Sequence, residues 1–465
     1  MSSAFETASA ITSALSRGGK LTLPKSSISV RLFDHYHQKV YGAGSAIRGE
    51  VVISPLRDTR FENIEITFIG VTRTTLVATQ VPQRSSHTFL KLNMPILESK
   101  YPHPRVLEKG VPFTLPFHFV VPAQLTLSAC RHNAEDPRVR DYHTRLPPTM
   151  GPGSAFWDKY DLAPETAIVE YFVRARVLGE PDESSGNRPA RLFEATKAVR
   201  VLPNSPEDAP LDITAEDVKY TVSKTKSVRK GVFKGKAGRF SAAAEQPPAI
   251  MLGADGRHAG DSAITVRLGF EPKEFGEAPP RVKSVSAKLI ARTYYGVTPA
   301  RTLPDMGRLP DFPVEPPRLS YKVAVPLFTT DVDHVTWHEA AAARRDSGYS
   351  TEHGSSIDED RAKPAAEPTH TAALYIPFDI PAEHKTFLPT FHSCLVSRVY
   401  SMQLTLTVGP ANTTVSLEVP VQVAVEPTDD ALALGMEAAE AAELEEYLTP
   451  RLLQLRVGEN LPGYA

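Results

Sequence analysis

Apolar and polar residues alternate with a period of two in several segments of the chain. The segments 62–70, ENIEITFIG, and 168–179, IVEYFVRARVLG, show the pattern clearly. In an extended chain, successive side chains point to opposite faces, so this period is typical of a strand with one buried and one wet face. The predicted buried face comprises Ile64, Ile66, Phe68, Val169, Tyr171, Val173, Ala175 and Val177.

The same alternation returns in the second half of the chain. It is present in 263–270, AITVRLGF, in 399–408, VYSMQLTLTV, and in 415–425, VSLEVPVQVAV. Pro420 falls on the polar side of the last segment. Because proline cannot donate a hydrogen bond to a neighbouring strand, this segment is predicted to lie at a sheet edge or to be bulged there.

The connections between these strands favour antiparallel pairing. The chain holds 41 prolines in 465 residues, and no helical crossovers recur between the strands. Proline is excluded from helix interiors and central strands, so many short elements joined by turns are expected. The predicted fold class is all-β, with two tandem antiparallel β-sandwiches of immunoglobulin-like type.

Changes in composition divide the chain. A Pro/Asp/Ser-rich stretch at 202–212 separates the two β-rich regions, and a charged stretch poor in large apolar residues interrupts the second. Such a stretch cannot bury enough apolar surface to offset the entropy of ordering it. The predicted divisions are a disordered arm 1–27, a sandwich 28–205, a hinge 206–217, a sandwich 218–426 with a disordered insert 338–370, and an acidic helical tail 427–465.

Charge and motifs exclude several classes of function. The formal net charge is −2, so no overall field favours nucleic acid. No run of about 20 apolar residues and no convincing signal peptide is present. The two cysteines, Cys130 and Cys394, are far apart in sequence and suggest no disulfide framework; Cys130 in the loop sequence CRH is interpreted as structural. We therefore expect no enzyme, no cofactor and no metal site.

Several segments, in order, resemble the arrestin-like (α-arrestin) family, and in particular filamentous-fungal proteins containing an arrestin N-terminal domain. In the first region these are YGAGSAIRGEVVIS, DTRFENIEITFIGVTRT, GVPFTLPFHFVVPAQL and the stretch from ACRH to VEYFVRARV. In the second they are SKTKSVRKGVFKGKAGRFSAAAEQPPAI and FLPTFHSCLVSRVYSMQLTLTV. The resemblance covers roughly 28–205 and 218–426, and it implies the same two-sandwich fold as the alternation.

The resemblance also implies a function. Members of this family are adaptors that bind plasma-membrane transporters or receptors and recruit a HECT-type ubiquitin ligase, whose WW domains bind Pro-Tyr motifs. Ubiquitination then promotes endocytosis or sorting, so a cytoplasmic protein peripheral to the plasma membrane or endosome is expected. The chain contains no Pro-Pro-x-Tyr. A non-catalytic scaffold in trafficking or signalling that recruits no ligase therefore remains the alternative.

A basic stretch at 219–239 is the first candidate binding feature. It contains no acidic residue, and interleaved aromatic residues of the kind that bind nucleic acid are few. Basic residues near an anionic leaflet contribute about 1 kcal/mol each to membrane binding. Two interpretations stay open, a membrane-facing patch or a solvated hairpin whose charges are paired by neighbours. The candidate residues are Lys224, Lys226, Arg229, Lys230, Lys234 and Lys236.

The second candidate is the sequence GENLPGYA at 458–465. Leu461, Pro462 and Tyr464 fit the Leu-Pro-x-Tyr form of a WW-domain ligand, in which an extended proline-containing peptide lies on aromatic side chains. They follow the last predicted strand, where no core is expected to hold a leucine and a tyrosine. The competing interpretation is that the two side chains fold back onto the second sandwich.

Overall fold

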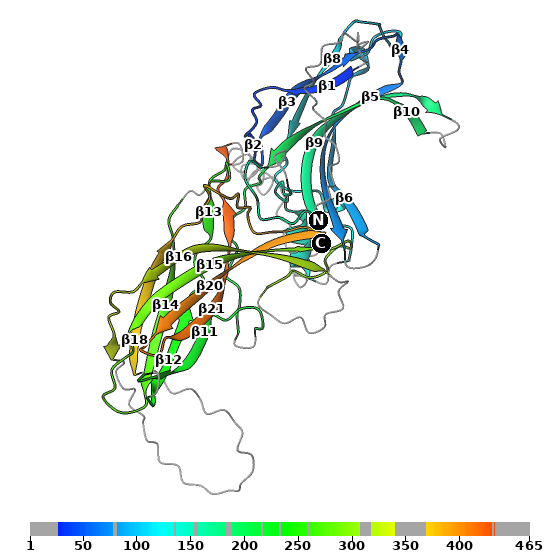
Figure 1. Ribbon diagram of the computed structural model, residues 1–465. Coiled ribbons are helices and arrows are strands. Elements are labelled where there is room, and N and C mark those ends of the chain that lie inside the picture. Colours follow the sequence, from blue (N-terminus) through cyan, green and yellow to red (C-terminus); the bar gives the residue numbers. More distant parts are fainter. Residues whose placement is uncertain are drawn as a thin grey trace, which may run out of the picture.

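The computed structural model describes residues 27–77, 81–133, 136–152, 157–182, 188–214, 217–231, 234–257, 260–306, 318–339, 369–429 and 432. Nearly all of the predicted arm 1–27, most of the predicted insert 338–370 and most of the predicted tail lie outside these residues. The described part is all-β, as the sequence predicts, with strands gathered into two sandwiches that lie end to end (Figure 1). Within these residues, no helix has the length and apolar character needed to cross a bilayer.

The N-terminal sandwich packs a three-stranded sheet against a five-stranded one. The smaller sheet has the order β1-β3-β8, with β1 Ser27–Leu32, β3 Ala46–Ser54 and β8 Phe113–Val120. The larger has the order β2-β10-β9-β5-β6, with β2 Val40–Tyr41, β10 Arg188–Val201, β9 Ala167–Asp182, β5 Asn63–Leu76 and β6 Gln83–Asn93. A further short pair joins β4 Thr59–Arg60 and β7 Val106–Leu107.

The C-terminal sandwich consists of two five-stranded sheets. One has the order β11-β12-β14-β18-β17, with β11 Ser223–Arg229, β12 Lys236–Ala244, β14 Ser262–Pro272, β18 His370–Phe378 and β17 His338–Glu339. The other has the order β16-β15-β20-β19, with β21 also paired to β20. Its strands are β16 Leu319–Asp331, β15 Val282–Tyr295, β20 Val396–Val408, β19 Phe391–His392 and β21 Thr413–Val421.

Short parallel pairings lie where the sandwiches meet. Strand β13, Ile250–Leu252, pairs in parallel with β22, Val423–Val425. The end of β22 also bridges Ser205, just after the N-terminal sandwich, through two hydrogen bonds between Ser205 and Val425. The last described strand therefore returns to the junction between the sandwiches (Figure 1).

Helical structure among the described residues is slight. Its elements are the 3₁₀ turns η1, Glu98–Lys100, and η2, Leu127–Ala129, and the α-helix α1, Pro137–Thr144, and Asp429 and Leu432 are also helical. The carboxylate of Asp136 accepts a hydrogen bond from the Arg138 backbone N–H, and Pro137 occupies the first helical turn. Both are typical of a helix start, because an aspartate side chain satisfies a free backbone donor and proline needs none there.

The predicted buried faces are confirmed. All eight apolar residues named for the segments 62–70 and 168–179 are at most 2% exposed, and so are the alternating apolar residues of β14 and β20. Strand β21 is paired along its length to β20 alone, apart from one bridge between Glu418 and Thr221, so the edge position predicted from Pro420 is also confirmed.

Two details differ from the sequence-based prediction. The segment 415–425 is divided, because β21 ends at Val421 and β22 starts at Val423, with Gln422 turned toward the hinge. In the first half of β20 the predicted alternation fails on both faces. Arg398, on the face of Tyr400 and Met402, is a buried charge, and Ser397, on the opposite face, is fully buried instead of wet. The N-terminal sandwich contacts Arg398 through Asp161 and Met150, and alternation within one strand cannot reveal such a second body.

Candidate functional site: the junction between the sandwiches

Arg398 of β20 lies at the centre of the junction and is fully buried. Its guanidinium donates to Thr293 Oγ1 at 2.9 Å within the C-terminal sandwich. Across the junction it donates to the backbone oxygen of Asp161 at 3.1 Å and to the Met150 sulfur at 3.7 Å. Because a buried cation is costly unless its donors are satisfied, this side chain favours the docked arrangement of the two sandwiches.

Asp161 supplies the N-terminal side of this contact. Its carboxylate accepts backbone N–H bonds from Gly151 at 2.8 Å and from Ala163 at 3.1 Å. Burial raises the pKa of Asp161, while the nearby Arg398 and the backbone donors act in the opposite direction. The carboxylate thus shapes the loop that presents its own carbonyl oxygen to Arg398.

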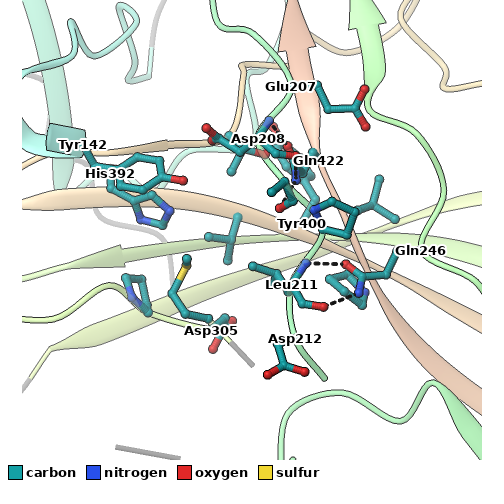
Figure 2. A pocket seen from close by; sticks show the side chains of 18 of the residues that line it. Tyr142, Glu207, Asp208, Leu211, Asp212, Gln246, Asp305, His392, Tyr400 and Gln422 are labelled. Atoms are coloured by element: carbon teal, nitrogen blue, oxygen red, sulfur yellow. Dashed lines mark hydrogen bonds between the residues drawn. The ribbon is translucent and has the colours of Figure 1, made fainter. Parts of the chain in front are cut away.

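A cavity of about 570 Å³ lies beside this contact. Figure 2 shows it between the hinge, helix α1 and the strands of the C-terminal sandwich, with Tyr142 of α1 lying against His392 of β19. The two rings meet edge to face, 5.1 Å between centroids. The Arg145 guanidinium also lies over the Tyr142 ring, with its central carbon 4.2 Å from the ring centroid. Both sandwiches and the hinge therefore line this cavity.

Two glutamines of the C-terminal sandwich hold the hinge along the cavity wall. Gln246 accepts from the Leu211 N–H at 2.9 Å and donates to the Leu211 carbonyl oxygen (Figure 2). Gln422 accepts from the Asp208 N–H at 2.9 Å and donates to the Asp208 carbonyl at 2.8 Å. Each amide satisfies both backbone groups of one residue, as a neighbouring strand does, so the hinge is docked as an extended segment.

The acidic residues of the hinge are also engaged. Asp208 forms an ion pair with Arg145 at 3.0 Å, and Glu207 accepts from the Ala249 N–H at 2.9 Å. These contacts position the hinge, and they do not pair a nucleophile with a base. The arrangement is suited to holding two bodies and a connecting peptide in one geometry.

A second charged network lies inside the C-terminal sandwich, on the strand next to Arg398. Arg292 of β15 forms an ion pair with Glu418 and donates to Ser401 Oγ at 3.1 Å. Its guanidinium also lies 4.0 Å from the carboxylate of Asp305, which Lys219 pairs with at 3.2 Å. Asp305 adopts a left-handed backbone, φ 56°, and its carboxylate accepts from the Tyr294 hydroxyl at 2.9 Å.

Both cysteines of the chain lie at the junction, although the sequence suggested no relation between them. Cys130 follows η2 in the N-terminal sandwich and Cys394 lies between β19 and β20, and both are buried. Burial raises the pKa of the Cys394 thiol to about 12 and lowers the pKa of His143 to about 3. His143 and His132 complete a compact group with the two thiols. Sequence reasoning missed this group because its members meet only through the fold.

The basic stretch forms the hairpin of β11 and β12. Lys224, Arg229, Lys234 and Lys236 are exposed. Two other members have partners, since Lys226 donates to the Thr414 carbonyl oxygen at 2.7 Å and Lys230 forms ion pairs with Glu274 and Glu277 at 3.2 and 2.6 Å. The structure therefore places the patch away from the junction and pairs part of it, which leaves both interpretations of this stretch open. The second candidate, Leu461, Pro462 and Tyr464, lies outside the described residues.

Part of the chain is similar to a known protein family. A family model described as the Bul1 C terminus matches residues 354–425. Among described residues, this range holds β18, β19, β20, β21 and β22, and with them Arg398, Cys394 and Gln422 of the junction. Bul1 is an arrestin-related protein associated with a ubiquitin ligase, so the match supports an arrestin-like relationship at this coarse level. No curated protein matches the chain.

Proposed function

We propose that this protein is a non-enzymatic adaptor that brings a HECT-type ubiquitin ligase to integral membrane cargo. The observation that carries the proposal is the match of 354–425 to the Bul1 C terminus, a family associated with a ubiquitin ligase. The matched strands contribute Arg398 to the surface that docks against the N-terminal sandwich, so the similarity includes part of the junction between the two bodies.

An adaptor needs binding surfaces held in a fixed relation, and it needs no reacting groups. Tethering a ligase beside its substrate raises the local concentration of the ligase at the acceptor lysines. The hinge contacts of Gln246 and Gln422 and the junction contact of Arg398 support this role, since they restrain the sandwiches that would bear the cargo. The proposal places this adaptor at the cytoplasmic side of the plasma membrane or endosome, where it would bind its integral membrane cargo.

The ligase side of the proposal rests on Leu461, Pro462 and Tyr464. A WW domain binds such a segment through the ring of the proline and of the tyrosine, so Tyr464→Ala should abolish capture of the full-length protein by immobilised WW domains of a HECT-type ligase. Tyr447→Ala is the matched control, because it removes a tyrosine from the same tail outside the motif. It should leave capture unchanged.

The same pair of variants distinguishes the alternative function. In cells, ubiquitination of bound cargo should fall with Tyr464→Ala and persist with Tyr447→Ala. If the full-length protein associates with cargo and neither variant changes ligase recovery or cargo ubiquitination, the protein is a scaffold without ligase recruitment through this motif.

We also propose that the basic hairpin contacts anionic lipid while the protein acts as an adaptor at the membrane. Lys224, Arg229, Lys234 and Lys236 are exposed and have no ion-pair partner among the described residues. The acids that pair Lys230 lie in the β14–β15 loop, where Phe275 is fully exposed. An exposed aromatic ring beside unpaired cations is suited to the boundary between headgroups and acyl chains.

Replacing those four basic residues with glutamine should weaken co-sedimentation with phosphatidylserine vesicles at low salt. At about 1 kcal/mol for each charge, the four charges amount to about 4 kcal/mol, which is nearly a thousandfold in affinity. A charge-matched control changes exposed lysines of the N-terminal sandwich and should have little effect: Lys91, Lys100, Lys109 and Lys197. Equal losses in both variants would indicate a general effect of net charge and remove the membrane role of the hairpin.

A further inference from the structure

The two cysteines and two histidines at the junction form one compact group. Cys130 and His132 follow the turn η2, and His143 lies in the last turn of α1, all in the N-terminal sandwich. Cys394 comes from the turn between β19 and β20 in the C-terminal sandwich. Cys130, His143 and Cys394 are buried and His132 is partly buried. Since the chain has two cysteines in 465 residues, this group contains every thiol of the protein.

The donor atoms are spaced as ligands of one metal ion. His132 Nε2 lies 3.1 Å from His143 Nδ1 and 3.2 Å from Cys130 Sγ, which is 3.7 Å from His143 Nδ1. Cys394 Sγ is the fourth donor atom, and all four lie within 4.8 Å of one another. In a tetrahedral zinc site, bonds of about 2.3 Å to sulfur and 2.0–2.1 Å to nitrogen put neighbouring donors roughly 3.3–3.8 Å apart.

The surroundings of the group support the same assignment. His132 Nδ1 faces the backbone oxygen of Asn133 at 3.2 Å, a contact that puts the proton on Nδ1 and directs the Nε2 lone pair into the group. Two thiolates and two neutral imidazoles would balance the charge of one divalent ion. That balance accounts for a buried set of polar groups that contains no carboxylate.

We propose that Cys130, His132, His143 and Cys394 bind one Zn²⁺ ion that clamps the two sandwiches together. On binding, each thiol releases one proton and its sulfur forms a bond to zinc, so two protons leave and no electrons are transferred. Three ligands belong to one sandwich and the fourth to the other, so the ion would join bodies that the hinge alone connects covalently. This proposal is independent of ligase or cargo binding.

The first experiment measures metal content. The full-length protein, purified without chelator, should carry about one zinc per chain by inductively coupled plasma mass spectrometry. Cys394→Ser and His132→Asn should each reduce zinc affinity by about 100-fold or more, since loss of even an outer-shell partner costs about 10–100-fold. His384→Asn and His118→Asn, which change exposed histidines outside the group, should retain full zinc. Partly buried His132 gives a variant that is expected to fold, and circular dichroism checks this.

A second experiment identifies the coordination and the clamp. Cobalt(II) should replace zinc and give the intense absorption bands of a tetrahedral thiolate site in the wild type and not in Cys394→Ser. Removal of zinc by chelator should enlarge the radius of gyration measured by X-ray scattering, with the same change in Cys394→Ser.

Three outcomes would overturn the proposal. The first is a folded wild-type protein that neither carries zinc nor binds added zinc or cobalt. The second is a disulfide between Cys130 and Cys394 in the protein purified without oxidant. The third is zinc content that survives in both Cys394→Ser and His132→Asn.

Discussion

Two buried arginines on neighbouring strands of one sheet are stabilised in different ways. Arg292 of β15 lies against the carboxylates of Glu418 and Asp305, all within the C-terminal sandwich. Arg398 of β20 donates to uncharged acceptors, and two of them, at Asp161 and Met150, belong to the N-terminal sandwich. The first arginine therefore stabilises its own sandwich, while the second is fully satisfied only when the two sandwiches are docked.

The difference shows how a junction can be specific without an ion pair. An arginine bonded to a carboxylate of its own domain gains little from docking, because its charge is already compensated. Arg398 has no carboxylate bonded to its guanidinium among the described residues, so its donors depend on backbone and sulfur acceptors that a misplaced partner would not supply. A wrongly docked arrangement would therefore leave the buried Arg398 charge without acceptors, at a cost in free energy.

The largest expected effect comes from removing Arg398. Arg398→Ala leaves a large void and unpaired acceptors at the junction, and it should lower the free energy of unfolding by about 3–5 kcal/mol in urea denaturation. Arg398→Met, which keeps most of the volume and removes the charge, should cost clearly less. Equal costs for the two variants would mean that the hydrogen bonds of the guanidinium, which both variants lose, and not the filled volume, stabilise the junction.

A smaller effect is expected inside the C-terminal sandwich. Glu418→Gln leaves Arg292 with a neutral acceptor and should cost about 1–3 kcal/mol of unfolding free energy. A double-mutant cycle with Arg292→Met should give a coupling of roughly 0.5–3 kcal/mol, as for residues in one network. The cycle between Glu418→Gln and Arg398→Met should be close to additive. Strong coupling between Glu418→Gln and Arg398→Met would mean that the two arginines belong to one network, and the distinction between them would not hold.

Asp161, next to Arg398, should make the unfolding free energy depend on pH. Because burial raises its pKa in the folded state, the folded chain binds more protons than the unfolded chain between the ordinary value of about 3.9 and the raised value. Unfolding free energy from this residue therefore falls as pH rises through that window, by at most about 1.4 kcal/mol per pH unit. The difference between wild type and Asp161→Asn, measured by denaturation from acid to neutral pH, should show this slope.

Replacing Arg398 should change the pH range over which Asp161 affects stability. The guanidinium lowers the pKa of Asp161 against the effect of burial, so Arg398→Met should raise that pKa and extend the window to higher pH. An unchanged window in Arg398→Met would show that the two groups do not interact, and would leave only the backbone contact between them.

The smallest expected effect is at the exposed rim of the junction. The Tyr160 and Tyr321 hydroxyls, one from each sandwich, are 2.9 Å apart. Tyr160→Phe should cost about 0.5–1 kcal/mol, as for a single neutral hydrogen bond, and adding Tyr321→Phe should cost little more. A full additive cost of the second change would show that each hydroxyl has a separate role.

The strands could be predicted from sequence, and the junction could not. Ile66 or Val173 alternates with polar neighbours because one sandwich has one core, and that pattern is local. Arg398 lies on the predicted apolar face of its strand, yet it is buried against the N-terminal sandwich, and nothing near it in sequence records that contact. Cys130 and Cys394 also come together only because the two sandwiches dock. Helix α1 did leave a local signal, the Asp136-Pro137 start, which sequence analysis did not use.

After β22, the described chain makes one more contact with the N-terminal sandwich. The Thr428 hydroxyl donates to the Ala43 carbonyl oxygen at 3.2 Å, and its methyl carbon would lie 2.6 Å from a β-carbon at Gly42. Thr428 thus attaches the end of the described chain to the loop after β2, within the N-terminal sandwich. A β-carbon at Gly42 would crowd the Thr428 methyl group, so Gly42→Ala would force Thr428 to shift and would weaken its bond to Ala43.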